Sequence, residues 1–204
     1  MNQPQLIVML KAPVAGYVKT RLANSIGPEA ACSVYRELVE GLLNGIAGIG
    51  PMTVHYAPGD ADTERVMRAW LGDGYGYVPQ PGGDLGVRME AAVEGAFACG
   101  AGGAILLGGD CPYVDRVMIG DVERRLQSHD VIIGPAVDGG YYLLALRRRA
   151  PCLFQGIAWG TDAVFSATLK RAEQAGLSVA LLDPREDVDD VPSWRRMQAF
   201  SRGR

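Results

Sequence analysis

The chain has 204 residues, of which 48% are hydrophobic and 21% are charged, and its formal net charge is −3. These values are typical of a globular protein, and the length predicts one domain over residues 1–204. The slightly negative charge excludes a general affinity for nucleic acid or anionic membranes, because both attract basic proteins.

The numbers and spacing of cysteines and histidines narrow the possible classes of protein further. The four cysteines form no CxxC pair, which argues against a zinc knuckle and against a disulfide framework. Reduced thiols are typical of a cytoplasmic protein, so we expect that location. Two histidines are too few for a multi-histidine metal site. We also expect no signal peptide and no membrane span, since no apolar run approaches roughly 18 residues.

Apolar runs typical of strands alternate along the chain with stretches typical of helices. The predicted strands are residues 5–10, 52–57, 75–78, 104–108, 130–136, 141–146 and 177–182. Helices are predicted near residues 28–46, 66–71, 84–98, 114–126, 161–175 and 192–201. The alternation predicts an α/β fold with three layers, α/β/α, around a mainly parallel, mixed central sheet. In such sheets ligands bind beyond the carboxyl ends of the strands, so the segments that follow the strands are candidate sites.

A basic loop, "KAPVAGYVKTRL" at residues 11–22, follows the first predicted strand. It carries Lys11, Lys19 and Arg21, and no acidic residue occurs before Glu29. The loop lacks GxxxxGK[ST], so it is not a P-loop, and its single glycine excludes the dinucleotide-binding fingerprint. It is either a solvated surface turn or a loop whose cations contact phosphate oxygens, to which ammonium and guanidinium groups are both suited.

The backbone of this loop also suits a ligand. Pro13 pushes Ala12 into an extended conformation, and Gly16 allows the backbone to approach a bound molecule closely. In the functional interpretation these three residues, with Lys11 and the two later cations, bind a nucleotide.

Carboxylates follow two other predicted strands. Asp110 comes directly after residues 104–108, and the segment "DPREDVDD" at residues 183–190 follows the last strand. Asp187 and Asp189 are two residues apart, which places both carboxylates on one side of an extended segment. Each has an ordinary interpretation as well, a turn former or helix cap for Asp110 and an exposed acidic loop for the other two.

If the three carboxylates meet, a divalent cation is the natural partner. Two carboxylates about 4 Å apart repel each other by roughly 1–4 kcal/mol, and a cation removes that penalty. Carboxylate, water and phosphate oxygens are the ligands that Mg²⁺ prefers, and Mn²⁺ is the alternative. A basic loop and an acidic cluster at one edge of one sheet can together hold a metal–nucleotide complex.

The segment "PQPGGDLGVRM" at residues 79–89 offers further candidates. Gln80 follows a strand and could read a nucleobase edge through its amide donor and acceptor. Gly83 permits close approach of a ligand. Asp84 is interpreted first as a helix cap and second as an acceptor-binding residue.

A tight turn in "GPAVDGGYYLLAL", residues 134–146, predicts a β-hairpin. Gly139 and Gly140 form the turn, and a functional role would direct Asp138 and Tyr141 toward an acceptor. Trp159 either belongs to the core, which we favour, or stacks on a ligand.

Five motifs together resemble one family over roughly residues 5–195. They are "KAPVAGYVKTRLA", "GGDLGVRM", "LLGGDCP", "GPAVDGGYYLLAL" and "DVDD". The resemblance is to DUF2064, a family of small bacterial, glycosyltransferase-like proteins. More distantly, the chain resembles 2-phospho-L-lactate guanylyltransferases and molybdenum-cofactor guanylyltransferases. It departs from the guanylyltransferases by lacking a GGxGTR loop, and from many glycosyltransferases by lacking a DxD motif after the middle strand.

The resemblance implies a GT-A, or nucleotide-diphospho-sugar transferase, fold. It also implies that Asp110, Asp187 and Asp189 match magnesium-binding positions, and that Lys19 and Arg21 match phosphate-contacting ones.

These observations predict a Mg²⁺-dependent transferase in which Lys19, Arg21 and Asp110 act on the phosphates. Nucleotidyl transfer from a nucleoside triphosphate to a small phosphorylated acceptor is preferred, because a basic loop suits a triphosphate. Glycosyl transfer from a nucleotide sugar is the close second. A non-catalytic nucleotide-binding protein of the same fold is a further alternative, and a nicotinamide oxidoreductase is disfavoured by the missing GxGxxG. The sequence leaves the acceptor, the nucleobase and the oligomeric state open.

Overall fold

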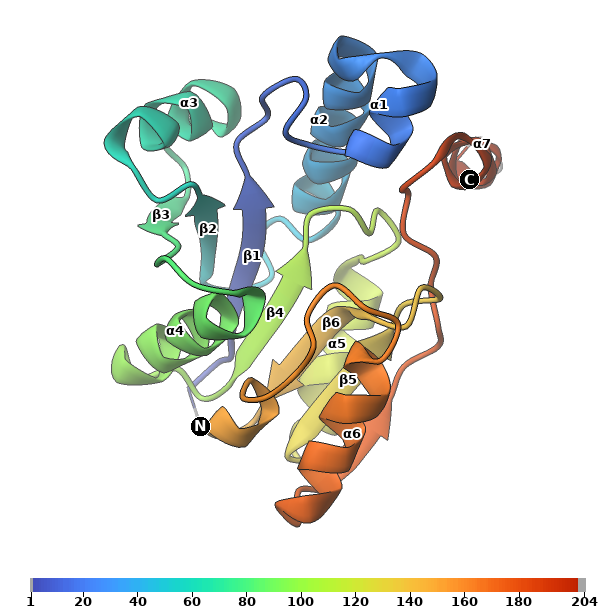
Figure 1. Ribbon diagram of the computed structural model, residues 1–204. Helices are drawn as coiled ribbons and strands as arrows, with labels where there is room; N and C mark the ends of the chain where they lie inside the picture. Colours follow the sequence, from blue (N-terminus) through green and yellow to red (C-terminus); the bar gives the residue numbers. More distant parts are fainter. Residues whose placement is uncertain (1, 202–204) are drawn as a thin grey trace.

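A seven-stranded mixed sheet forms the centre of the molecule in the computed structural model, which describes residues 2–201, with side chains for residues 2–198 (Figure 1). The strand order is β3-β2-β1-β4-β6-β5-β7. The strands are β1 Gln5–Lys11, β2 Met52–Ala57, β3 Gly76–Pro79, β4 Ala104–Gly108, β5 Val131–Pro135, β6 Tyr141–Leu146 and β7 Val179–Leu181. The helices are α1 Thr20–Ile26, α2 Pro28–Gly45, α3 Ala61–Leu71, α4 Leu85–Ala98, α5 Arg116–Arg125, α6 Val164–Gln174 and α7 Val191–Ser201, with a 3-10 turn at Pro151–Leu153.

Strand direction determines which segments reach the same edge of this sheet. The pairs β1–β2, β1–β4, β2–β3 and β5–β7 are parallel, whereas β6 runs antiparallel to both β4 and β5. The start of β6 therefore lies at the edge where the other strands end. The predicted hairpin between β5 and β6 is confirmed, and its turn lies at this carboxyl edge.

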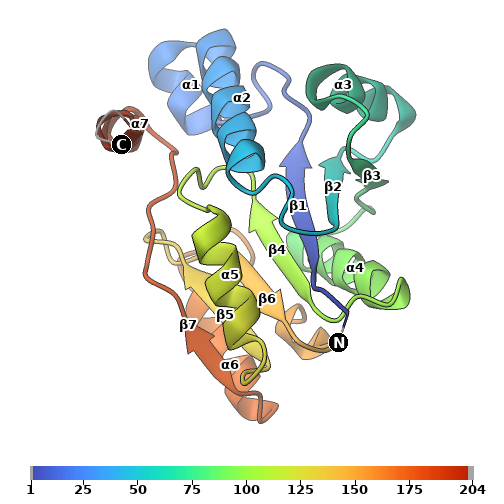
Figure 2. The same ribbon diagram turned by 180° about the vertical axis from the view of Figure 1, so that it is seen from behind.

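Helices cover both faces of the sheet, which confirms the predicted three-layer α/β/α fold (Figures 1 and 2). Helices α2 and α5 pack on one face, and α4 and α6 pack on the other. Strand β1 supplies both cores by alternation, with Leu6, Val8 and Leu10 on the first face and Ile7 on the second. Residues buried on both faces explain why the strands are nearly continuous apolar runs.

A third, smaller core joins the beginning of the chain to its end. The acidic strap, residues 183–190, leads from β7 to α7, which lies beside α1 in both views (Figures 1 and 2). Val188 of the strap is fully buried against Leu22 of α1 and Leu38 of α2. This contact brings the strap next to the basic loop.

Helix α1 is absent from the sequence-based prediction, which began the first helix at Gly27-Pro28. It has seven residues, and no side chain caps its start, so its local signals are weak. The burial of Leu22 in the third core stabilises it instead.

Among the helices of the described residues, none combines the length and apolar character that crossing a membrane requires.

Candidate functional site

Two adjoining cavities open at the carboxyl edge of the sheet. The charged cavity, about 380 Å³, is lined among others by Lys11, Lys19, Arg21, Asp110 and Asp189. The apolar cavity, about 560 Å³, is lined among others by Val14, Ala57, Pro58, Gln80 and Pro81. Both are bordered by Lys11 and Tyr17, so the basic loop forms their common wall. The first cavity is therefore lined by charged side chains, whereas the second is mainly apolar.

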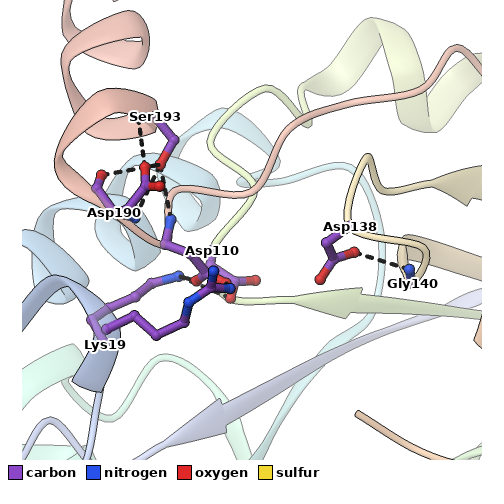
Figure 3. Close-up of polar contacts among 8 residues, drawn as sticks. Lys19, Asp110, Asp138, Gly140, Asp190 and Ser193 are labelled. Atoms are coloured by element: carbon purple, nitrogen blue, oxygen red, sulfur yellow. Dashed lines mark hydrogen bonds and ion pairs between the residues drawn. The ribbon is translucent and has the colours of Figure 1, made fainter. Parts of the chain in front are cut away.

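Lys19 lines the charged cavity, and its side chain points toward Asp110 (Figure 3). Its Nζ is 3.0 Å from Oδ2 of Asp110 and 2.8 Å from Oδ1 of Asp189, and its side chain is only 5% exposed. Arg21 is 74% exposed and places Nη1 3.7 Å from Oδ2 of Asp189. Cations from the start of the chain and carboxylates from its middle and end therefore share one site.

The backbone of Lys19 is unusual. Its φ of 46° and ψ of 47° lie in the left-handed region, at the start of α1. Among residues 2–201, Lys19 is the one non-glycine residue with a positive φ. An L-residue there costs about 1–2 kcal/mol, which neighbouring packing must offset. Val18 and Leu22, both buried, hold the chain on either side of it. Burial acts to lower the pKa of Lys19, but the charges and hydrogen bonds of Asp110 and Asp189 outweigh it and raise that pKa.

Asp187 interacts electrostatically with Asp110, Asp189 and Lys19, but its own carboxyl group is more buried than those of the other two aspartates. Its Oδ1 is buried and has no hydrogen-bond partner among the side chains of residues 2–198 or the backbone of residues 2–201. Burial raises the pKa of its carboxyl to about 7, and the charges of Asp110 and Asp138 add to the rise, against the opposing charge of Lys19. A buried carboxylate oxygen without a partner is a ligand atom that a cation would satisfy.

The predicted three-aspartate metal site is not preformed. Within residues 2–201, no group of three or more His, Cys, Asp or Glu side chains is arranged to hold a metal ion. The Lys19 ammonium, rather than a cavity lined by three carboxylates, lies between Asp110 and Asp189. The donor set nevertheless fits a hard divalent cation, because it combines the unpartnered oxygen of Asp187 with two further carboxylates. The metal role of these residues stays a prediction.

Two positioning residues escaped the sequence-based prediction. The Tyr35 hydroxyl accepts a hydrogen bond from the Lys11 backbone N–H and donates one to the Lys11 carbonyl, both at 3.0 Å, and so clamps the end of β1. Ser193 accepts hydrogen bonds from the backbone N–H groups of Asp189 and Asp190 (Figure 3). No local pattern marks the Tyr35 clamp, whereas the aspartate three residues before Ser193 is a helix-start signal.

Two further candidates in the basic loop, Ala12 and Pro13, support the loop rather than protrude from it. Both are buried, and the Ala12 N–H donates to the Ala57 carbonyl at 2.9 Å. Gly16 has a φ of 83°, a conformation that favours glycine.

Gln80 is buried, and its amide nitrogen donates to the carbonyls of Leu10 and His55, at 3.2 and 2.7 Å. The Gln80 amide nitrogen therefore already has two acceptors, and the nucleobase-binding role of Gln80 stays a prediction. Asp84 caps α4 by accepting from the Val87 N–H, as its first interpretation predicted. Gly83 has a φ of 116° beside this cap.

The hairpin residues divide into two groups. Asp138 points toward the carboxyl edge and accepts a hydrogen bond from the Gly140 N–H (Figure 3). Gly139, with a φ of 91°, has no room for a Cβ because the Asp162 backbone lies against it. Tyr141, by contrast, packs partly buried against the second core, where its hydroxyl lies 3.8 Å from the Met89 sulfur, and its acceptor-binding role stays a prediction.

Trp159 also packs against the second core, beside Gly86, as the core interpretation predicted.

The chain resembles known proteins both in sequence and in structure. The family model DUF2064, described as an uncharacterized protein conserved in bacteria, matches residues 45–161. No curated protein is significantly similar in sequence. A crystal structure from Desulfovibrio desulfuricans G20, provisionally described as a nucleotide-diphospho-sugar transferase, is 35% identical, with a TM-score of 0.93 over 98% of this chain and 88% of that one.

Two more distant structures show the fold alone. A CMP:2-keto-3-deoxy-manno-octonic acid synthetase complexed with CTP has a TM-score of 0.60 at 13% identity, over 99% of both chains. Rv0371c from Mycobacterium tuberculosis H37Rv, in complex with manganese, has a TM-score of 0.57 at 17% identity, over 96% of this chain and 98% of that one. The 35%-identical structure confirms the predicted nucleotide-diphospho-sugar transferase fold.

Proposed function

This chain belongs to the DUF2064 family, and we propose that it is a divalent-cation-dependent transferase that moves a nucleotidyl group from a nucleoside triphosphate to a small phosphorylated acceptor. The observation that carries the proposal is the convergence of Lys19, Arg21, Asp110 and Asp189 in one cavity beside an apolar one. The likeness in fold to a synthetase complexed with CTP and to a protein in complex with manganese supports it.

The two cavities suit the two halves of a nucleotide. The apolar cavity would hold the base, with the Gln80 carbonyl oxygen as an acceptor for a base donor, since the Gln80 amide nitrogen is occupied. The charged cavity would hold the phosphates, with Lys19 and Arg21 as donors to their oxygens. Asp110, Asp187 and Asp189 would hold the cation, which supplies neutralisation of phosphate charge when it is bound.

In the proposed reaction an acceptor phosphate oxygen forms a bond to the α-phosphorus of the triphosphate. The bond from that phosphorus to the bridging oxygen breaks, and pyrophosphate leaves with the electron pair. Such transfer needs positioning and charge stabilisation more than covalent catalysis by the protein. Lys19 and Arg21 would stabilise charge that develops on the phosphates, and Asp138 at the hairpin turn would face the acceptor.

Glycosyl transfer from a nucleotide sugar is the second candidate, because the 35%-identical structure is provisionally described as a nucleotide-diphospho-sugar transferase. The product separates the two reactions. Nucleotidyl transfer releases pyrophosphate, whereas glycosyl transfer releases a nucleoside diphosphate. A thermal-shift screen of nucleoside triphosphates and nucleotide sugars, with and without Mg²⁺, identifies the donor, and product analysis with a panel of small phosphate monoesters identifies the reaction.

Asp110→Asn tests the assignment of the site. We expect Mg²⁺-dependent turnover to fall by about 100-fold or more, because a charged ligand to the cation is lost. Asp62→Asn, which removes an 81%-exposed carboxylate on α3, is the matched control and should keep the wild-type rate. An Asp110→Asn variant with the wild-type rate would overturn the proposal. Nucleotide binding that is indifferent to Mg²⁺, without turnover, would favour the non-catalytic alternative.

A further inference from the structure

Lys19 occupies the place that a divalent cation would need. The ammonium contacts one oxygen from Asp110 and one from Asp189, and these carboxylates come from segments 91 and 170 residues away in sequence. A divalent cation held between the two carboxylates would take an oxygen from each at about 2.0–2.1 Å, in the space where the ammonium lies. The ammonium and the divalent cation therefore exclude each other between Asp110 and Asp189.

The charges around Lys19 explain why an occupant is needed. Asp110, Asp187 and Asp189 carry three carboxyl groups, whereas Lys19 is the buried cation among them and Arg21 is largely exposed. Without a cation at the centre, Asp110 and Asp189 would face each other uncompensated. The left-handed backbone of Lys19 directs its side chain into this position at a conformational cost, which the two ion pairs help to offset.

We propose that Lys19 is a built-in counter-ion that holds the cation position in the nucleotide-free protein and is exchanged for the divalent cation when a triphosphate arrives. This inference rests on the proposed function, since triphosphate oxygens are the new partners for the displaced ammonium. Lysine suits this role because it is a compact charge on a flexible stem, which can swing without moving the backbone. Lys19 thereby couples cation binding to phosphate binding.

The exchange predicts that replacing Lys19 raises the affinity for a divalent cation. A lysine that only binds nucleotide would not have this effect. Lys19→Met removes the competitor, so the nucleotide-free variant should bind Mn²⁺ more tightly than the wild type, by about tenfold or more. The same variant should bind inorganic triphosphate more weakly in the absence of metal. Mn²⁺ binding is measured by electron paramagnetic resonance of the free ion, and triphosphate binding by calorimetry in EDTA.

Arg21→Met is the matched control. It removes the same unit of charge close to Asp189 but does not vacate the position between the carboxylates. Its Mn²⁺ affinity should rise much less than that of Lys19→Met. Equal or lower Mn²⁺ affinity for Lys19→Met than for the wild type, or equal gains in both variants, would overturn the exchange.

A measurement on the wild type decides the matter if Lys19→Met does not fold. The chain has three lysines, Lys11, Lys19 and Lys170, so their side-chain NMR signals can be assigned individually. Saturating Mg²⁺ with inorganic triphosphate should shift the Lys19 signal and leave that of Lys170 in place. An unchanged Lys19 signal at saturation would refute the proposal. These readouts concern binding alone, so they stand apart from the turnover and product assays that decide the proposed function.

Discussion

His55 shows how a single buried group makes the stability of this protein depend on pH. It is 7% exposed in β2, and burial lowers the pKa of its imidazole from 6.5 to about 4. Between these pH values the unfolded chain binds a proton at His55 that the folded chain excludes. The free energy of unfolding therefore falls as the pH is lowered through this window, by about 3 kcal/mol from this group.

Replacing His55 tests that contribution. In His55→Asn, the loss of unfolding free energy between about pH 7 and about pH 4.5 should be smaller than in the wild type, by about 2 kcal/mol. Urea denaturation at the two pH values measures it. Val117→Ala changes an 81%-exposed position without a titratable group and should keep the wild-type pH dependence. The same pH dependence in His55→Asn and the wild type would contradict the explanation.

At the scale of elements, the start of α7 holds the acidic strap in place. Asp190 accepts from the Ser193 N–H at 2.8 Å, and Ser193 Oγ accepts from the N–H groups of Asp189 and Asp190, each at 3.1 Å. This reciprocal capping satisfies backbone groups that the first turn of a helix leaves unpaired. Because Asp189 is one of the capped residues, the helix start also orients a carboxylate of the site.

Ser193→Ala should lower the free energy of unfolding by about 1–3 kcal/mol, because two partly buried N–H groups lose their acceptor. Ser193 is 4% exposed, so water cannot readily replace the hydroxyl. Ser166→Ala, on the exposed side of α6, is the control and should change stability by about 0.5 kcal/mol or less. Chemical denaturation compares the two, and equal effects would argue against the strap-holding role.

For the molecule as a whole, the third core connects the first loop to the last helix. Val188 is fully buried between α1, α2 and α7, and it separates Asp187 from Asp189 in the strap. Its burial holds the strap against the segment that begins at Lys19. The geometry of the charged cavity therefore depends on packing outside that cavity.

Val188→Ala should reduce the unfolding free energy by about 1–3 kcal/mol through lost burial and a residual cavity. Amide hydrogen exchange over residues 187–190 should also become faster, because the strap loses its anchor. Val117→Ala, at an 81%-exposed position, should leave both quantities close to wild type. Unchanged exchange in the strap of Val188→Ala would show that other contacts hold it.

Several elements could be predicted because their signals are local. The β5–β6 hairpin follows from Asp138-Gly139-Gly140 between two apolar runs, and the Asp84 cap follows from its position before α4. Helix α1 could not be predicted, since its stability comes from the burial of Leu22 rather than from a cap or length. The orientation of the Tyr141 side chain could not be predicted from neighbouring residues either, because it depends on a contact with Met89 in α4.

By itself, the amino-acid sequence determined the α/β layers and the edge of the sheet where basic and acidic segments would gather. Periodicity and turn chemistry are properties of neighbouring residues, so they can be read without the fold. Only the tertiary structure decided that Lys19 lies between Asp110 and Asp189, that Asp187 keeps a buried oxygen without a partner, and that the Gln80 amide is occupied. Each of these features depends on contacts between segments that are far apart in the chain. The packing of the cores determines which of their side chains come within hydrogen-bond distance.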